Sequence, residues 1–390
     1  MSDIAPLMWE KLAPADGAAV LTTPSLTYWQ DARRRLWANR PAMVSIGFII
    51  LLILAAIFGP LLSPFTYYDQ NLKLANIPPA FETYAVADGQ GTTTRFFLNA
   101  SNFNLYEVDE AGHVLGILRG ERKDMIKKSQ PFKFGDTAVT LDYSARPARL
   151  LAADGTAILP SGWSWNMTYL FGTDQLGRDV LVRQLYGARI SLTVAFVATL
   201  VNFFIGIFYG GIAGYMGGRT DAIMMRIVEI ISTIPLTLYV VLLMVVFNSG
   251  LFSIIIAIGS VFWVDMARIV RGQILSLKQQ DYVAAARTMG ASTGRILTKH
   301  LLPNSISPII VTLTMLIPSA IFIESFMSFI GLGVTPPLAS WGTLTSEAVE
   351  TLRAYPHQLF FPAAAISLTM FAFNFLGDGL RDALDPRMRT

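Results

Sequence analysis

The sequence predicts an all-α polytopic membrane protein with six transmembrane helices and a small β-rich insert after the first of them. Two observations support this fold class. The chain of 390 residues is 53% hydrophobic and only 15% charged, whereas soluble domains carry about 25% charged residues. The apolar residues also gather into six runs of about 20 residues, the length that a helix needs to cross the hydrocarbon core of a bilayer.

The six predicted transmembrane helices follow these runs. The first covers residues 42–62, contains no charged residue and follows an arginine-rich segment at residues 33–40. It is too long for the apolar core of a signal peptide and lacks a convincing cleavage site, so it is predicted to remain in the mature chain. The other five cover residues 190–216, 227–247, 251–270, 306–330 and 360–376.

The distribution of basic residues predicts the orientation. The loop at residues 217–226 contains Arg219 and Arg226, and residues 265–306 hold six Lys or Arg against two Asp. Short loops rich in Lys and Arg stay in the cytoplasm, so both termini are predicted to be cytoplasmic. The net charge of +3 is therefore attributed to loops at the lipid bilayer and not to the binding of nucleic acid.

The chain divides into four predicted parts. They are a cytoplasmic arm (1–41), the first transmembrane helix (42–62), an extracytoplasmic insert (63–170) and a core (171–390) that holds the other five helices and a cytoplasmic loop (265–306). Alternating polar and apolar residues between turn signals predict β-strands in the insert. These strands cover residues 95–98, 104–108, 113–118, 138–143, 148–152 and 156–159, with turns at 109–112 and 153–155.

Residues that the chain lacks exclude several classes of protein. It has no cysteine, and its three histidines, His113, His300 and His357, form no pair at ligand spacing. Disulfides, thiolate catalysis and a zinc site are therefore not expected. The chain also lacks a G-x-x-x-x-G-K-[ST] phosphate-binding loop and the Ser/His or paired-carboxylate arrangement of an intramembrane protease. The sequence predicts no catalytic residue, metal site or cofactor in this chain.

Two short helices are predicted at the cytoplasmic surface. Asp281 is a suitable N-cap for the first, which Gly290 ends, and the second covers residues 294–302 and ends at Pro303. The first helix is expected to expose a small, Ala-rich face that holds Tyr282, Ala285, Ala286 and Met289. Such a face could fit a groove on another protein or lie on lipid headgroups, and the pattern alone leaves both possibilities open.

The same segment resembles a known motif. Ala284-Ala285-Ala286, followed by Gly290 and by His300-Leu301-Leu302-Pro303, is similar to the E-A-A loop of ABC importer permeases. In that family the loop forms a coupling helix that docks into an ATPase subunit. The resemblance assigns this role to Asp281, Tyr282, Ala284, Ala285, Ala286, Arg287, Gly290, Leu302 and Pro303. Ala284 replaces the usual Glu and His300 stands where Ile is common, so the polar contact expected from that Glu has no counterpart here.

A second segment narrows the resemblance. Residues 171–192, FGTDQLGRDVLVRQLYGARISL, are similar to the signature of the second, or C, subunit of dipeptide and oligopeptide permeases. From the residues, Asp174 can cap a turn that Gly177 relieves, and Asp179 can pair with Arg183 one helical turn later. The signature residues at the outer face are Gly172, Asp174, Gly177, Arg178, Asp179, Arg183, Gly187 and Arg189. The resemblance extends over about two thirds of the chain and omits the insert and the extreme N-terminus.

Glycines and prolines within the predicted helices suggest packing and bending. Gly206, Gly210, Gly214 and Gly218 recur every four residues and can let a second helix approach closely. A contact that slides during gating is the alternative reading of this repeat. Pro235 and Pro318 are expected to kink their helices, and a gate could use such kinks.

Ionisable residues in transmembrane helices are costly and often functional. Glu229, Asp265 and Arg268 lie near the cytoplasmic ends of the predicted helices, where pairing or contact with headgroups is expected. Glu324 lies deeper, and we expect it to form a buried polar bond near the translocation pathway.

The resemblance implies a permease subunit of an ATP-driven ABC importer for dipeptides or oligopeptides in the bacterial inner membrane. It further implies a heterodimer with a homologous permease, two ABC ATPase subunits that bind ATP and Mg²⁺, and an extracytoplasmic substrate-binding protein. The insert is interpreted as a docking surface for that protein, with a decorative insertion as the alternative. Three other functions stay open: import of nickel or another small solute, ion-coupled secondary transport, and an adhesion or sensor protein acting through residues 65–170.

Overall fold

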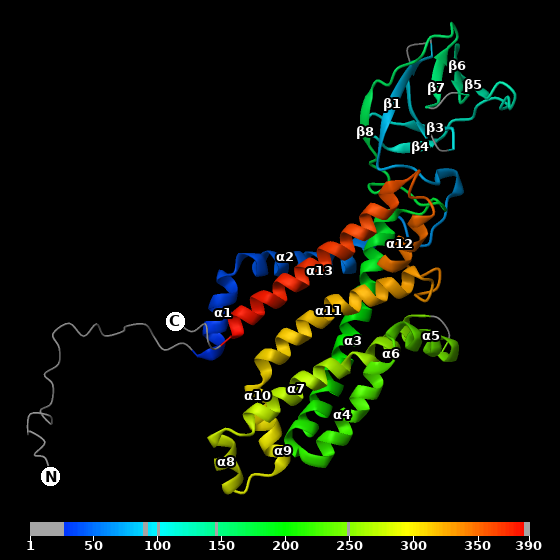
Figure 1. Cartoon of the computed structure of the whole chain (residues 1–390). Coiled ribbons are helices and arrows are strands. Elements are labelled where there is room, and N and C mark those ends of the chain that lie inside the picture. The colour runs from blue at the N-terminus through cyan, green and yellow to red at the C-terminus, as the bar shows by residue number, and fades with distance from the viewer. Residues whose placement is uncertain (1–26, 89–92, 100–101, 145–146, 248–249, 386–390) are drawn as a thin grey trace, which may run out of the picture.

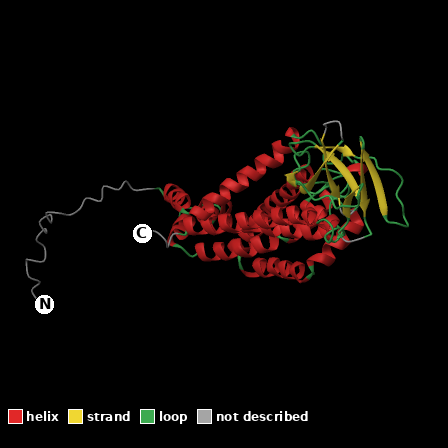
Figure 2. Ribbon diagram, turned by 90° about the horizontal axis from the view of Figure 1, so that it is seen from above, coloured by secondary structure: helices red, strands yellow, loops and turns green. Residues whose placement is uncertain are grey.

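The computed structural model describes residues 27–88, 93–99, 102–144, 147–247 and 250–385. Long helices form an elongated bundle with a β-sheet unit at one end and a group of short helices at the other (Figure 1). Seen along a perpendicular direction, the strands again gather at one end of the helices (Figure 2). The two ends of the bundle therefore carry different kinds of structure.

The helices follow the predicted order with altered bounds. They are α1 (Tyr28–Ala38), α2 (Arg40–Leu62), α3 (Val180–Met216), α4 (Gly218–Thr233), α5 (Leu236–Phe247), α6 (Leu251–Val261), α7 (Trp263–Leu277), α8 (Asp281–Thr288), α9 (Thr293–Ile296), α10 (Leu302–Asn304), α11 (Ile306–Phe329), α12 (Trp341–Val349) and α13 (Pro356–Leu384). A 3-10 turn, η2 (Leu72–Leu74), follows α2, and a π-helical turn, η3 (Leu297–Leu301), joins α9 to α10.

Five helices are long and apolar enough to cross a membrane: α2, α3, the continuous α6–α7 helix (Leu251–Leu277), α11 and α13. The single helix predicted over residues 227–247 is wrong, because this region forms α4 and α5, which bend by 84° at their junction. Pro235 lacks an N–H to continue the helix and forces Ile234 into an extended conformation, with ψ of 122°. Within the described ranges there are thus five candidate spans, or six if the bent pair counts as one.

Glycines on α3 let α7 approach its backbone closely. A Cβ atom at Gly210 would lie only 2.3 Å from the carbonyl oxygen of Ala267. At Gly206 and Gly214 the nearest atoms of α7 would lie 2.5 Å and 2.9 Å away. Gly218, by contrast, begins α4 and has open space at its Cβ position. The predicted close approach is confirmed for the three glycines within α3.

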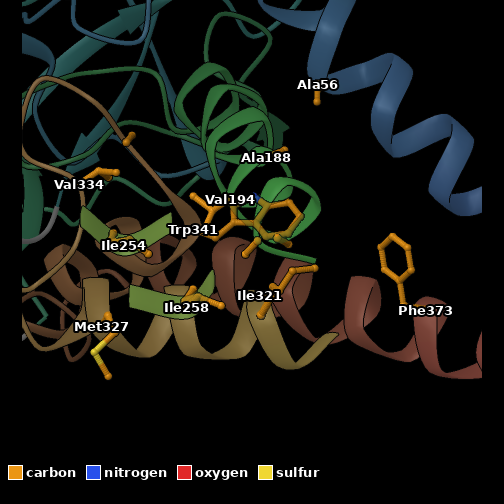
Figure 3. Packing of buried hydrophobic residues seen from close by; sticks show 14 of the residues in the cluster. Ala56, Ala188, Val194, Ile254, Ile258, Ile321, Met327, Val334, Trp341 and Phe373 are labelled. Atoms are coloured by element: carbon orange, nitrogen blue, oxygen red, sulfur yellow. The ribbon is translucent and has the colours of Figure 1, made fainter. Parts of the chain in front are cut away.

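Trp341 lies in the main apolar core of the bundle (Figure 3). Its indole is fully buried and donates a hydrogen bond to the carbonyl oxygen of Gln184 on α3, 3.1 Å away. The same cluster takes Ile254 from α6, Ile321 from α11 and Phe373 from α13. The short helix α12 is therefore built into the bundle and does not lie loosely on its surface.

The insert folds into two antiparallel sheets packed face to face. The larger sheet has the order β4-β3-β2-β1-β8 and the smaller one β5-β6-β7. The strands are β1 (Ala80–Ala87), β2 (Thr93–Asn99), β3 (Asn104–Val108), β4 (Val114–Ile117), β5 (Ser129–Phe134), β6 (Thr137–Asp142), β7 (Arg149–Ala152) and β8 (Gly162–Trp165). Phe96 and Leu105 of the larger sheet pack with Phe132 and Leu141 of the smaller one.

The strand predictions are met in five places and missed in others. β2, β3, β4, β6 and β7 overlap predicted strands, whereas residues 156–159 form only an isolated bridge from Ala157 to Leu151. β1, β5 and β8 are additional. β5 contains Pro131, which argues against a strand in sequence but is tolerated because β5 is an edge strand. β8 has four residues, and its two tryptophans, Trp163 and Trp165, lie on one face and are both exposed, so its apolar residues do not mark a buried face.

Polar contacts join the insert to the bundle. The N–H of Thr173 donates to the carbonyl oxygen of Ile77 at 2.9 Å. The side-chain amide of Gln358, in the first turn of α13, donates to the carbonyl oxygen of Thr173 and to Oδ1 of Asn76, each at 2.9 Å. Both connecting segments of the insert are thus fixed to α13.

Candidate functional site

The short helices at the end opposite the sheets form a compact helical hairpin (Figure 1). Val283 and Ala286 are the buried residues of α8, and they pack in one cluster with Ile274 of α7, Ile296 of α9 and Ile309 of α11. The remaining side chains of α8 are exposed. The prediction that Ala286 lies on the exposed face is therefore wrong, because the buried pair is spaced three residues apart and points into the bundle.

Gly290 ends α8 as predicted. It adopts a positive φ of 81°. Its N–H donates to the carbonyl oxygen of Arg287 at 2.9 Å, and the N–H of Ala291 donates to the carbonyl oxygen of Ala286 at 3.0 Å. These two bonds are the Schellman pattern that a left-handed residue permits at a helix C-terminus. No atom lies within 4 Å of a Cβ placed on Gly290, so this turn is open to solvent.

Two details of this hairpin differ from the prediction. Asp281 is the first residue of α8 and not its N-cap; the N-cap is Gln280, which makes no side-chain capping bond. Pro303 does not end the second helix, because the chain continues from η3 into α10 and Pro303 lies within it. Proline is tolerated there because the first turn of a helix needs no N–H donor.

The hairpin contacts the end of α3. The Arg287 guanidinium lies 5.3 Å from the centre of the Tyr215 ring, and Leu297 would be in van der Waals contact with a Cβ on Gly211. The last two turns of α3 are therefore in direct contact with α8 and with the π-helical turn η3. Tyr282, Ala284, Ala285 and Met289 make up the exposed apolar part of α8.

At the other end, residues 171–192 build an ion-pair network. Arg178 Nε and Arg183 Nη1 each lie 2.7 Å from Oδ2 of Asp174. Both arginines also bind Glu347 of α12, at 2.8 Å and 2.7 Å. Arg183 is only 2% exposed, whereas the side chain of Glu347 is 40% exposed, so the network runs from the buried start of α3 to the partly exposed edge of α12. Glu347 was not identified from sequence, because its spacing from the signature reveals no contact.

Two glycines permit the tight turn before α3. Gly172 and Gly177 have positive φ angles of 76° and 69°, and Cβ atoms there would lie 2.3 Å and 1.9 Å from the carbonyl oxygens of Ile77 and Asn71. Asp174 accepts the backbone N–H of Arg178 at 3.0 Å. The predicted capping role of Asp174 and the relief at Gly177 therefore agree with the geometry.

Asp179 does not pair with Arg183 as predicted. It is the N-cap of α3 and accepts the N–H of Val182 at 3.0 Å, so its side chain turns toward the helix start while Arg183 turns toward Asp174. Burial, opposed by this hydrogen bond, raises the pKa of the Asp179 carboxyl to about 6. A helix N-cap favours the charged form, but here loss of hydration outweighs it.

This raised pKa predicts a pH-dependent stability. The folded state binds the proton of Asp179 more tightly than the unfolded chain, whose pKa is about 4. The contribution of Asp179 to the free energy of unfolding is therefore fully present below pH 4 and is lost, by about 2 to 3 kcal/mol, as the pH rises through about 6. Asp179→Asn keeps an oxygen for the cap and is expected to remove this decrease.

Melting temperatures of the parent and Asp179→Asn proteins, measured from about pH 4 to 8, test this pH dependence. Asp154→Asn, on an exposed turn, is the control. Parallel curves for the parent and Asp179→Asn proteins would contradict the prediction.

Two further signature residues contact neighbouring helices. A Cβ on Gly187 would lie 3.2 Å from the backbone of Ser340, so glycine allows α12 to start close to α3. Arg189 donates to the carbonyl oxygens of Ala56 and Ile57 near the end of α2. Pro60 in α2 has no N–H to donate to the carbonyl of Ala56, four residues earlier, and Arg189 donates a hydrogen bond there instead.

Glu324 lies in a fully buried nest of serines. Its carboxylate accepts hydrogen bonds from Ser191 of α3 and Ser328 of α11, both at 2.8 Å. Ser191 also accepts the N–H of Trp341 at 3.2 Å. The expected buried polar bond is thus present and joins α3, α11 and α12; its relation to a translocation pathway stays a prediction. Pro318 lies within α11, which continues through it.

A further ion pair joins α4 and α7. Arg271 of α7 holds Asp221 of α4 with two bonds of 2.5 Å and 2.7 Å, a contact that the sequence did not reveal. Among the residues that the structure describes, no group of three or more His, Asp or Glu could hold a metal ion. The functional features of the described chain are therefore surfaces and ion pairs at the two ends and within the bundle.

Comparisons with known proteins agree with this picture. Residues 206–390 match the family described as "binding-protein-dependent transport system inner membrane component", and residues 27–79 match the N-terminal transmembrane domain of oligopeptide transport permease C. The chain is 40% identical over 390 residues to the oligopeptide transport system permease protein OppC of Bacillus subtilis (strain 168), covering 100% of both chains. It is 41% identical over 367 residues to the dipeptide permease protein DppC of the same organism, covering 94% of this chain and 88% of that one.

More distant relatives show the same family. OppC of Escherichia coli (strain K12) is 36% identical over 361 residues, covering 93% of this chain and 92% of that one. Among solved structures, the inward-facing MetNI methionine ABC transporter matches with a TM-score of 0.41 and 20% identity, covering 50% of this chain and 94% of that chain. From the full-length identities, this chain belongs to the family of inner membrane components of binding-protein-dependent ABC transport systems, in the branch that includes the OppC and DppC permease proteins.

Proposed function

We propose that this chain is the C-type permease subunit of an ATP-driven importer of dipeptides or oligopeptides. The names of its relatives support peptides as cargo and do not favour nickel import, ion-coupled transport or a sensor role. The chain would pair with a homologous permease and form half of the pathway. Two ATPase subunits would bind ATP and Mg²⁺, and a substrate-binding protein would deliver the peptide from outside.

The position of α8 is the observation that carries the mechanism. One face of α8 packs through Val283 and Ala286 against α7, α9 and α11, while Ala284, Ala285 and Met289 are exposed at the free end of the bundle. An ATPase subunit docked on the exposed face would transmit its movement to three helices at once. We therefore assign ATPase coupling to the segment from Asp281 to Pro303 and place it, with both termini, in the cytoplasm.

With this orientation the β-sheet insert lies outside the cell. It is separated from α8 by the length of the bundle (Figure 1), and Gln358 and Thr173 hold it to the outer end of α13. This placement suits a docking surface for the binding protein. The ion pairs around Arg183 would keep the outer ends of α3 and α12 together while the peptide passes.

Bulky charge on the exposed face of α8 is expected to uncouple transport from ATP hydrolysis. Ala285→Arg and Gly290→Arg should assemble into the membrane yet reduce peptide uptake and peptide-stimulated ATPase activity by at least about tenfold, the effect of 1.4 kcal/mol at the docking contact. Both rates are measured in proteoliposomes that contain the complete importer. Ala38→Arg, the same substitution at an exposed position of α1 outside both proposed docking surfaces, is the matched control.

The two rates separate the possible failures. If Ala285→Arg and Gly290→Arg keep the rates of the Ala38→Arg importer, the coupling assignment is wrong. If the unsubstituted importer hydrolyses ATP but takes up no peptide, the proposed cargo is wrong instead.

A further inference from the structure

Five polar side chains form an exposed strip where α4 meets α7. On α4, Arg226 Nη1 lies 2.7 Å from Oε2 of Glu229. On α7, Arg268 Nη1 lies 3.3 Å from Oδ1 of Asp265, and its Nη2 donates to Oγ of Ser232 at 2.8 Å, which joins the two helices. We call Arg226, Glu229, Ser232, Asp265 and Arg268 the polar strip.

On α7, Asp265 and Arg268 of the polar strip lie within the candidate membrane span Leu251–Leu277. Asp265 is 14 residues from the start and 12 residues from the end of the continuous helix Leu251–Leu277, or about 18 to 21 Å from either end at 1.5 Å per residue. The expectation that Asp265 and Arg268 lie near the cytoplasmic end of the span stays a prediction, and α7 continues beyond both residues to Leu277. The bond from Arg268 to Ser232 sets the strip on α4 at the same depth.

The charged groups of the strip face away from the core of this chain. Side-chain exposure is 74% for Arg226 and 57% for Glu229, and 44% for Arg268 and 62% for Asp265. Val228 of α4, by contrast, is 1% exposed and packs with Trp263 of α7. Charged groups in the middle of a membrane face a bundle interior or a water-filled cavity, since exposure to lipid is costly.

The backbone next to the strip independently indicates water. Thr233 ends α4, Ile234 is extended, and α5 leaves at 84°. Ile234 and Leu238 beside this break are 43% and 59% exposed. Non-helical backbone at membrane depth is tolerated only where protein buries it or where it lines a water-filled cavity. In this chain the break is exposed, so a water-filled cavity satisfies both the backbone and the charges.

We propose that the polar strip lines the peptide passage and binds the charged ends of the peptide backbone, an inference that rests on the proposed function. The arginines at positions 226 and 268 receive the terminal carboxylate, and Glu229 and Asp265 receive the terminal ammonium. Each ion pair is neutral as a whole, so the strip offers both signs of charge without favouring acidic or basic side chains. The peptide exchanges for one partner of an exposed pair, which keeps its binding weak enough for release.

The absence of cysteine from the whole sequence makes the location of the strip testable. Ser232→Cys and Glu229→Cys are assembled separately into importers whose other subunits are cysteine-free, and treated with a trimethylammonium methanethiosulfonate reagent that stays in water. Both cysteines are expected to react. At a peptide concentration about ten times its dissociation constant, about one site in ten stays free, so the reaction should slow about tenfold.

Two control variants define the unreactive cases. They are Leu51→Cys and Val228→Cys. Leu51 lies on α2 and is 65% exposed, and Val228 lies on α4 and is 1% exposed. Neither should react. If Ser232→Cys and Glu229→Cys are as unreactive as these controls, lipid or the second permease covers the strip. The proposal that the strip lines the passage is then wrong.

A charge-specific measurement tests the contact with the peptide ends. Arg268→Gln is expected to raise the KM for a free peptide about tenfold, the loss of about 1.4 kcal/mol, and to leave the KM for the same peptide with a C-terminal amide unchanged. An equal rise for both peptides overturns the contact with the carboxylate, as does cysteine reactivity that a transported peptide does not slow. An unsubstituted importer that transports no peptide would instead overturn the proposed function.

Discussion

Replacing Arg183 with leucine is expected to lower the free energy of unfolding by about 3 to 5 kcal/mol. The side chain is 2% exposed and binds Asp174 and Glu347, each at 2.7 Å. Leucine fills part of the space but removes one of the two arginines that compensate the Asp174 carboxylate, whose side chain is 11% exposed. Asp174 keeps Arg178 as its remaining partner, so the loss comes from the buried bond between Arg183 and Asp174 and from the bonds by which Arg183 holds α12 to α3.

The melting temperature of the purified importer in detergent measures this effect. Arg122→Leu removes an exposed arginine of the insert and is the matched control, expected to change the free energy of unfolding by no more than about 0.5 kcal/mol. Arg183→Lys keeps the charge without the forked geometry and should fall between them. Equal melting temperatures for Arg183→Leu and Arg122→Leu would show that the network adds nothing to stability.

A single methyl group at Gly210 is expected to destabilise the bundle by about 1 to 3 kcal/mol. The new Cβ would lie 2.3 Å from the carbonyl oxygen of Ala267 and 3.0 Å from its Cα. Both contacts are with backbone, so no side-chain rotation relieves them, and α7 has to move away from α3. The expected result is a lower melting temperature for Gly210→Ala, together with a smaller yield of monodisperse protein.

Gly47→Ala is the matched control for this prediction. Gly47 lies within α2, and no atom lies within 4 Å of its Cβ position. Alanine has the higher helix propensity, so this variant is expected to gain up to about 1 kcal/mol. Opposite signs for the same substitution in two helices isolate the effect of close packing. A Gly210→Ala variant that melts at or above the parent temperature would be incompatible with the observed α3–α7 contact.

Sequence reasoning succeeded where the signal is local. The turn at Gly177 and the end of α8 at Gly290 both follow from the positive φ that glycine accepts, and the glycine repeat on α3 indicates packing whatever its partner is. These inferences need only residues that are neighbours in the chain or on one helix face. The same holds for the strands of the insert that alternate strictly.

It failed where the partner is distant in sequence. Asp179 and Arg183 have the spacing of a helical ion pair, but Glu347, more than 160 residues away, and Asp174 compete for Arg183, and Asp179 is used as the N-cap. Ala286 has the composition of an exposed face, yet the position of α7 and α11 decides that it is buried. The hydropathy of residues 227–247 likewise predicts an apolar segment long enough to cross the bilayer. It does not predict that the chain changes direction at Pro235.

The length of α3 has a mechanical consequence. Its 37 residues form one uninterrupted helix of about 55 Å, anchored near its start by Arg183 and contacted near its end by Leu297 and Arg287. If the end of this helix at Arg183 is held, a tilt of about 5° moves the other end, next to Leu297 and Arg287, by about 5 Å. A small rotation of α3 about its Arg183 end is therefore the same motion as a displacement of its other end by about one helical turn.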